Sequence, residues 1–188
     1  MVEINEKFRD SVKDLGEYIA LATIPAKEYN KANISIIKEL VQKQKIPGVY
    51  VTLSKPYTTV EQTFKKSGID TRMILFIDAV TKTVKGQTKK TKNCLYIGSP
   101  EHLSDISLAM DQAVRSLPSH DKFVFFDSLS VLLMYNELDT VARFIHFLAN
   151  KMRVWKVKGI IVSLTKEKDK ELIQELMQFC DVFLEFEK

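Results

Sequence analysis

The chain has 188 residues, a length typical of one domain, and 45% of them are hydrophobic, which is enough to bury a core. Its 28 Lys and Arg residues against 24 Asp and Glu residues give a net charge of +4, a mildly basic balance that does not by itself indicate nucleic-acid binding. No apolar run approaches the roughly 18 residues that span a bilayer, and the polar N-terminus shows no secretion signal. We therefore expect residues 1–188 to form a single cytoplasmic domain that does not contact a membrane.

Apolar runs of strand length alternate with segments of helical periodicity along the whole chain. The expected strands are Tyr18–Ala22, Val49–Leu53, Met73–Asp78, Cys94–Ile97, Phe123–Phe126, Gly159–Leu164 and Val182–Phe186. The expected helices are Ile4–Leu15, Ile34–Val41, Tyr57–Lys66, His102–Leu117, Ser128–Tyr135, Leu138–Val154 and Lys168–Phe179, and Pro25–Asn33 is expected to be a polar loop. This alternation predicts an α/β fold, with three layers and a doubly wound, mostly parallel sheet.

The most informative stretch is Phe123–Tyr135, in which a short apolar run is followed at once by Asp127 and Ser128. A run this rich in aromatic residues predicts a strand buried on both faces. Open α/β sheets bind ligands at the carboxyl ends of their strands, where Asp127 would lie. Asp127 could hold Mg²⁺ beside a nucleotide, or it could cap the next helix. This stretch alone leaves both interpretations open.

A second distinctive stretch is Thr81–Asn93, which contains five lysines and no acidic residue. Because it is almost devoid of apolar residues, it predicts a flexible basic insertion or hairpin over residues 81–93. The candidate contacts for nucleic acid or another anion are Lys85, Lys89, Lys90 and Lys92. The alternative is a loop that is simply solvated.

Segments of the chain resemble the KaiC-like branch of the RecA superfamily of ATPases. Gly48–Leu53 resembles the second strand of that family, and Gly68–Asp70 with Met73–Ala79 resembles the following helix end and strand. Phe125–Ser130 is similar to the family's Walker B strand and the turn after it, and is the most specific of these matches. The resemblance implies a RecA-like, P-loop NTPase fold from about residue 16 to the end of the chain.

The chain departs from that family where a glycine-rich phosphate-binding loop should follow the first strand. The corresponding segment, Thr23–Asn33, contains no glycine, so side chains would obstruct the close approach of backbone to phosphate. Pro25 removes a backbone donor, and Glu28 adds a negative charge. Lys27 and Lys31 are positive, but neither stands in the Gly-Lys-Ser/Thr context of the family. The P-loop is therefore expected to be degenerate.

The resemblance also implies a carboxylate pair after the second strand, to activate the attacking water. Ser54 and Lys55 stand there instead, and neither is a usable general base at neutral pH. Of the three parts that the family's chemistry needs, only the Walker B carboxylate is present, as Asp127. We expect Asp127 to have a structural role, either capping the helix that follows or bonding across the sheet to the loop at Thr23.

These departures predict a pseudo-ATPase that acts as a regulatory or scaffolding module, with no catalytic residues and no bound cofactor. The implied partners are proteins, either a second copy or an active KaiC-like ATPase, in archaeal-type signalling. One alternative is an ATP-binding protein with a nonstandard, weakly or non-hydrolysing site at Lys27, Lys31, Asp127 and Ser128, with Mg²⁺ on Asp127. Another is a nucleic-acid-binding accessory protein. No metal or redox site is expected, because Cys94 and Cys180 are far apart and the three histidines are scattered.

Overall fold

The computed structural model describes residues 2–86, 88, 91–165 and 170–186. Seven strands form one sheet in the order β4-β3-β2-β5-β6-β1-β7, and every neighbouring pair runs parallel. The strands are β1 (Tyr18–Ile24), β2 (Gly48–Thr52), β3 (Ile74–Asp78), β4 (Cys94–Tyr96), β5 (Phe123–Asp127), β6 (Lys158–Leu164) and β7 (Val182–Glu185). A parallel sheet needs crossover connections, and helices supply most of them here.

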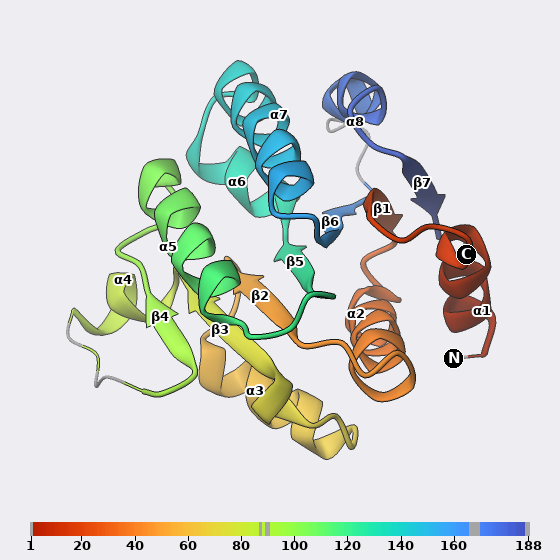
Figure 1. Ribbon diagram of the computed structural model, residues 1–188. Coiled ribbons are helices and arrows are strands. Elements are labelled where there is room, and N and C mark those ends of the chain that lie inside the picture. Colours follow the sequence, from red (N-terminus) through yellow and green to blue (C-terminus); the bar gives the residue numbers. More distant parts are fainter. Residues whose placement is uncertain (1, 87, 89–90, 166–169, 187–188) are drawn as a thin grey trace.

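Helices cover both faces of the sheet (Figure 1). One face carries α1 (Val2–Val12), α2 (Tyr29–Lys38) and α3 (Tyr57–Lys66). The other carries α5 (Leu103–Ser116), α6 (Leu129–Tyr135), α7 (Leu138–Val154) and α8 (Lys170–Met177). The short elements are α4 (Thr81–Lys85), the π-helical turn η1 (Glu39–Lys43) and the 3₁₀ turn η2 (Thr71–Met73). The three-layer, doubly wound architecture predicted from the sequence is confirmed.

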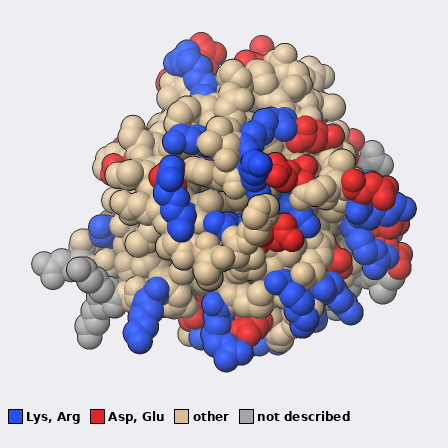
Figure 2. Space-filling view, viewed as in Figure 1, with Lys and Arg blue, Asp and Glu red and all other residues tan. Residues whose placement is uncertain are grey.

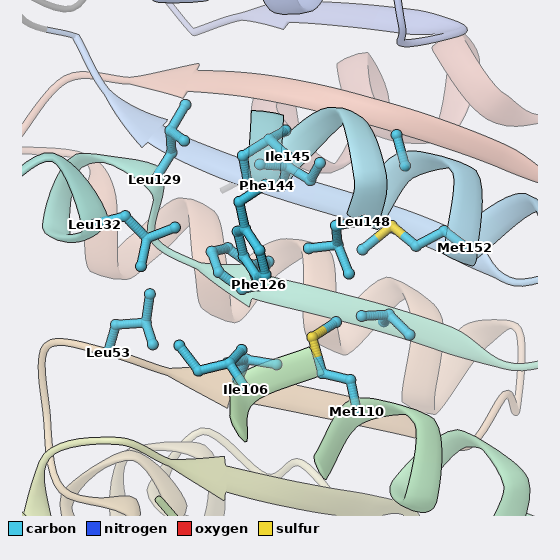
Figure 3. Packing of buried hydrophobic residues seen from close by; sticks show 14 of the residues in the cluster. Leu53, Ile106, Met110, Phe126, Leu129, Leu132, Phe144, Ile145, Leu148 and Met152 are labelled. Carbon is cyan, nitrogen blue, oxygen red and sulfur yellow. The ribbon is translucent and has the colours of Figure 1, made fainter. Parts of the chain in front are cut away.

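The central strand β5 separates two apolar cores. Phe123 and Phe125 pack against the layer of α1, α2 and α3, whereas Val124 and Phe126 pack against the opposite layer. Successive side chains of a strand point to opposite faces, so an uninterrupted apolar run is what a strand covered on both sides requires. Figure 3 shows the second core, with Leu53, Leu129 and Leu132 at one end and Met110 and Met152 at the other.

Two predicted segments differ from the structure. The polar loop expected over Pro25–Asn33 is shorter, because α2 already begins at Tyr29 and residues 25–28 alone join it to β1. The polar residues Asn30 and Lys31 suggested a loop, but they lie on the exposed side of α2, while Ala32 and Asn33 are buried against the sheet. The segment expected to be a flexible basic insertion or hairpin over residues 81–93 begins instead with a helix, α4, and Gln87, Lys89 and Lys90 lie outside the described residues.

The two ends of the described chain lie side by side at one edge of the sheet (Figure 1). Strand β7 forms that edge, and α1 packs beside it. Lys7 of α1 donates from Nζ to the backbone oxygen of Glu185 in β7 at 2.5 Å. Edge strands expose unpaired backbone groups, so α1 covers part of an otherwise open edge. None of the helices in the described residues combines the length and apolarity that crossing a bilayer requires.

Candidate functional site

The carboxyl edge of the sheet brings together the polar residues that end the central strands. The strand register places Thr52 of β2 level with both Asp78 of β3 and Asp127 of β5. All three side chains are buried. A shift of one residue in the strand register would move these three groups out of line. The buried apolar side chains of the strands fix the register, because such a shift would turn each of them to the opposite face of the sheet. The two carboxylates, however, have different partners.

The Asp127 carboxylate is enclosed by donors from the protein itself. The hydroxyls of Tyr29 and Tyr50 donate to its Oδ1 and Oδ2, respectively, and Asn33 donates from Nδ2 to Oδ2 at 3.4 Å. Only 4% of Asp127 is exposed. Tyr50 comes from β2, whereas Tyr29 and Asn33 come from α2, which follows the first strand. The Asp127 carboxylate is therefore hydrogen-bonded to side chains of two different elements: α2 supplies donors to both of its oxygens, and β2 supplies one to Oδ2.

Burial controls the protonation of this group. Desolvation raises the pKa of Asp127 above the ordinary carboxyl value, although the hydroxyls of Tyr29 and Tyr50 and the charge of Lys55 act in the opposite direction. Desolvation, reinforced by the neighbouring Asp127, also raises the pKa of Tyr29 and of Tyr50 well above 10. Both phenols therefore remain protonated donors at neutral pH. The arrangement favours a hydrogen-bonded carboxyl group that the protein shields from solvent.

The candidate cations of the β1–α2 segment are at the surface. Lys27 and Lys31 are exposed, and Lys31 Nζ lies 2.9 Å from Glu28 Oε2 in an ion pair. Asp127, in contrast, is buried beneath Tyr29 and Asn33. The side chains that α2 directs toward the carboxylate are thus a phenol and an amide, while the two lysines face solvent.

Ser128 follows Asp127 through a cis peptide bond and is the N-cap residue of α6. It is only 2% exposed, and its side chain makes no capping hydrogen bond. Asp127 bonds to the segment 23–33 across the sheet, which is one of the two structural roles considered for it. The nearby Ser130 Oγ accepts from the backbone nitrogen of Leu164 at 2.9 Å, and so ties α6 to β6.

The position after β2 holds a lysine bonded to α2. Lys55 Nζ donates to Asn30 Oδ1 at 2.6 Å, and the Lys55 carbonyl accepts from Thr52 Oγ1 at 2.6 Å. Ser54 is exposed. A hydroxyl and an ammonium group at these two positions can orient a ligand or a neighbouring loop, but they offer no carboxylate to accept a proton from water.

Asp78 is a buried carboxylate that sequence reasoning did not single out. It accepts from the backbone nitrogens of Tyr57, Val80 and Thr81 at 2.7, 2.8 and 2.8 Å, and from Thr81 Oγ1 at 2.5 Å. These donors open α3 and α4, so one carboxylate anchors the first residues of two helices. Its position at the end of a strand, three residues before the first residue of a threonine-containing helix, was the available signal.

Of the four candidate lysines in the basic segment, the structure describes Lys85 and Lys92. Lys85 is exposed at the end of α4, and Lys92 is exposed two residues before β4, while Lys89 and Lys90 lie outside the described residues. Among the residues that the structure describes, no three His, Cys, Asp or Glu side chains are grouped so that they could hold a metal ion.

Comparison with known protein families gives one assignment. Residues 42–186 match the family described as a family of unknown function, DUF7504. The chain belongs to this DUF7504 family. The matched residues include β2, β5 and Asp127, but not β1, Tyr29 or Asn33. No curated protein matches the sequence.

Solved structures establish what fold this DUF7504 member has. The KaiC-like protein PH0186 of the hyperthermophilic archaeon Pyrococcus horikoshii matches with a TM-score of 0.58 and 15% identity, over 80% of this chain and 63% of that chain. The uncharacterized protein PH0321 of Pyrococcus horikoshii, solved with an unknown peptide, matches with a TM-score of 0.65 and 14% identity, over 90% of this chain and 77% of that one. The RecA-like, KaiC-like fold inferred from the sequence is confirmed, and this chain spans less than two thirds of the KaiC-like protein.

Proposed function

We propose that this chain is a RecA-like pseudo-ATPase that does not hydrolyse ATP and serves as a regulatory or scaffolding interaction module. The observation that carries the proposal is the set of donors around Asp127. In nucleotide-hydrolysing relatives of this fold, the corresponding carboxylate holds Mg²⁺ at the phosphates. Here Tyr29, Tyr50 and Asn33 occupy its oxygens, and burial disfavours the charged form that a metal would need.

The β1–α2 segment supports the same proposal. A phosphate site of this fold needs a glycine-rich loop that leads its backbone N–H groups onto the phosphates at a helix N-terminus. Only residues 25–28 separate β1 from α2 here, and the first helical residue is Tyr29, whose side chain turns inward to Asp127. The proposed partners are a second copy or an active KaiC-like ATPase. That PH0321 was solved with a peptide supports a binding role for such a domain.

Calorimetric titration of ATP with Mg²⁺ into the full chain tests the proposal. We expect no saturable heat from the wild-type protein. Asp127→Ala and the double variant Lys27→Ala/Lys31→Ala are titrated alongside it, because the lysines are exposed and their removal leaves the core intact. Saturable binding that both variants abolish would overturn the proposal and favour the alternative ATP site built from Lys27, Lys31, Asp127 and Ser128.

Nucleic-acid binding has less support. On the face shown in Figure 2, Lys and Arg side chains are interspersed with Asp and Glu. A nucleic-acid surface usually gathers its cations into one patch or stripe. A mobility shift with DNA that weakens steeply as salt rises would nevertheless favour that alternative, because each phosphate contact releases counterions.

A further inference from the structure

A groove of about 580 Å³ lies between α5 and α7, in the helical layer that covers one face of the sheet (Figure 1). Its lining includes Leu103 and Leu108 of α5 and Phe144 and Phe147 of α7. Phe144 is buried in the core of Figure 3, whereas Leu108 is 59% exposed and Phe147 is 46% exposed. Apolar residues exposed singly are common, but two from opposite walls of one groove form a shared apolar surface of the kind that partners bind.

The α7 wall of the groove presents a cation, an aromatic ring and a second cation in sequence. Arg143, Phe147 and Lys151 all line the groove. They are four residues apart, so they lie along one side of α7 at intervals of about 6 Å. Lys151 Nζ lies 5.8 Å from the centre of the Phe147 ring, within the range of a cation–π contact. We call these three residues the α7 stripe.

The positive charge in the groove exceeds the negative charge. Asp111 of α5 is the only acidic side chain among the described residues that line it. The protein already surrounds this carboxylate, because Arg115 Nε lies 2.6 Å from Oδ2, Lys151 Nζ lies 3.7 Å from Oδ1, and Trp155 donates from Nε1 to Oδ1 at 3.0 Å. The guanidinium of Arg143 donates to a hydroxyl of its own helix at 3.4 Å and has no carboxylate partner among the described residues. One carboxylate therefore faces two cations, and a third cation is left without an acid.

The remaining acidic residues of the two helices do not compensate this charge. They are Asp105 of α5 and Asp139 of α7, and neither is among the described residues that line the groove. Asp105 Oδ2 lies 3.6 Å from Nδ1 of His102. Asp139 lies in the first turn of α7, where a negative charge complements the helix dipole. A ligand in the groove would therefore meet an apolar surface flanked by cations.

We propose that this groove binds an acidic amphipathic helix of a partner protein, which places one carboxylate beside Arg143 and another beside Lys151. Apolar side chains between the two carboxylates would cover Leu108 and Phe147. A helix matches the α7 stripe because its own side chains recur at the same spacing along one side. A second copy presenting this face would bring like charges together, and a polyanion without apolar groups would leave Leu108 and Phe147 exposed. This proposal rests on the proposed function, since it names the class of partner that the interaction module takes.

Fluorescence anisotropy with labelled peptides and the full chain tests this proposal. The probe is an Ala-based helical peptide with two glutamates eight residues apart and two adjacent leucines midway between them, all on one side of the helix. Two matched controls replace the glutamates with Gln or the leucines with Ala. A third has the same composition but carries the glutamates on the opposite side of the helix. We expect saturable binding of the probe, and affinity about tenfold or more weaker for each control peptide.

Variants of the protein assign the binding to this groove. Leu108→Glu and Arg143→Glu are each expected to weaken binding of the probe about tenfold or more, and both side chains are exposed, so the core stays intact. Val154→Glu is the control for the first, because Val154 is 76% exposed at the end of α7. Lys66→Glu is the control for the second, because Lys66 is exposed on α3 in the opposite layer and the change in charge is the same. Neither control should alter affinity, and Arg143→Glu should regain binding to a probe in which one Glu is replaced by Lys.

Several results would overturn the proposal. One is no saturable binding of the probe, and another is equal binding by every variant of the protein. Equal binding of the peptide with displaced glutamates would show that the groove does not recognise a helix by the spacing of its acids. Binding of a labelled single-stranded oligonucleotide that depends on Arg143 but not on Leu108 would assign the surface to nucleic acid, and self-association that Leu108→Glu abolishes would assign it to a second copy. None of these outcomes depends on ATP, so the calorimetric test of the pseudo-ATPase role stands or fails separately.

Discussion

The Tyr29 hydroxyl donates to the Asp127 carboxylate and so joins the start of α2 to the end of β5. Strand β6 lies between β1, which α2 follows, and β5, so this contact crosses an intervening strand. It places a phenol over the carboxylate at the sheet edge where α/β proteins bind their ligands. The contact therefore links the stability of the domain to the same group on which the proposed function depends.

Removing this hydroxyl should destabilise the protein. Tyr29→Phe would leave Oδ1 of a buried carboxylate without that donor, so we expect the free energy of unfolding to fall by about 1–3 kcal/mol. Urea denaturation followed by circular dichroism measures the change. Tyr135→Phe is the control, because Tyr135 is 46% exposed and its hydroxyl has no hydrogen-bond partner among the described residues. An equal loss in both variants would show that the contact with Asp127 contributes nothing.

The raised pKa of Asp127 predicts a pH dependence of stability. The folded protein holds the Asp127 proton more tightly than the unfolded chain, whose carboxyl has a pKa of about 3.9. The contribution of this group is therefore fully present below the unfolded pKa and is lost as pH rises through the folded pKa. Relative to Asp127→Asn, the wild-type protein should be favoured most at acid pH and progressively less as pH increases. Urea denaturation of both proteins across this range measures the difference, and a difference that grows with pH would contradict the expected sign.

Asp78 should be important for stability rather than for ligand binding. Asp78→Ala would leave the backbone N–H groups of Tyr57, Val80 and Thr81 without an acceptor, so we expect a loss of about 3 kcal/mol or more. Chemical denaturation measures this. Asp105→Ala is a suitable comparison, because the Asp105 side chain is 62% exposed and should change stability by less than about 0.5 kcal/mol. A soluble, fully stable Asp78→Ala protein would refute the anchoring role.

The close packing of β2 on β5 makes Gly48 intolerant of a side chain. A Cβ atom there would lie 2.3 Å from the ring of Phe123, its partner in the strand register. We expect Gly48→Ala to lower the free energy of unfolding by about 1–3 kcal/mol and Phe123→Leu to restore part of it in the double variant. Gly16→Ala is the control, since nothing lies within 4 Å of the added atom. Thermal unfolding of the wild-type protein, Gly48→Ala, Gly48→Ala/Phe123→Leu and Gly16→Ala measures these changes. An equal loss of stability in Gly48→Ala and Gly16→Ala would disprove the steric explanation.

Much of the fold follows from local signals in the sequence. The predicted bounds of α3 and α7 agree with the structure at both ends, because each is a long amphipathic segment with clear breaks on either side. The start of α2 was missed by several residues. Its first turn has Tyr29, Asn30 and Lys31, and no side chain caps it, so the usual start signals are missing.

The sequence by itself determined the alternation of strands and helices, the burial of β5 on both faces and the position of Asp127 at a strand end, because each depends on neighbouring residues and their periodicity. Only the tertiary structure decided which groups surround Asp127. Tyr29 and Tyr50 are 98 and 77 residues away from it along the chain. They reach it only because β2 pairs directly with β5 and α2 packs beneath the same sheet edge. Hydrogen bonds at such separation depend on strand order and register, which local hydrophobic patterns do not encode.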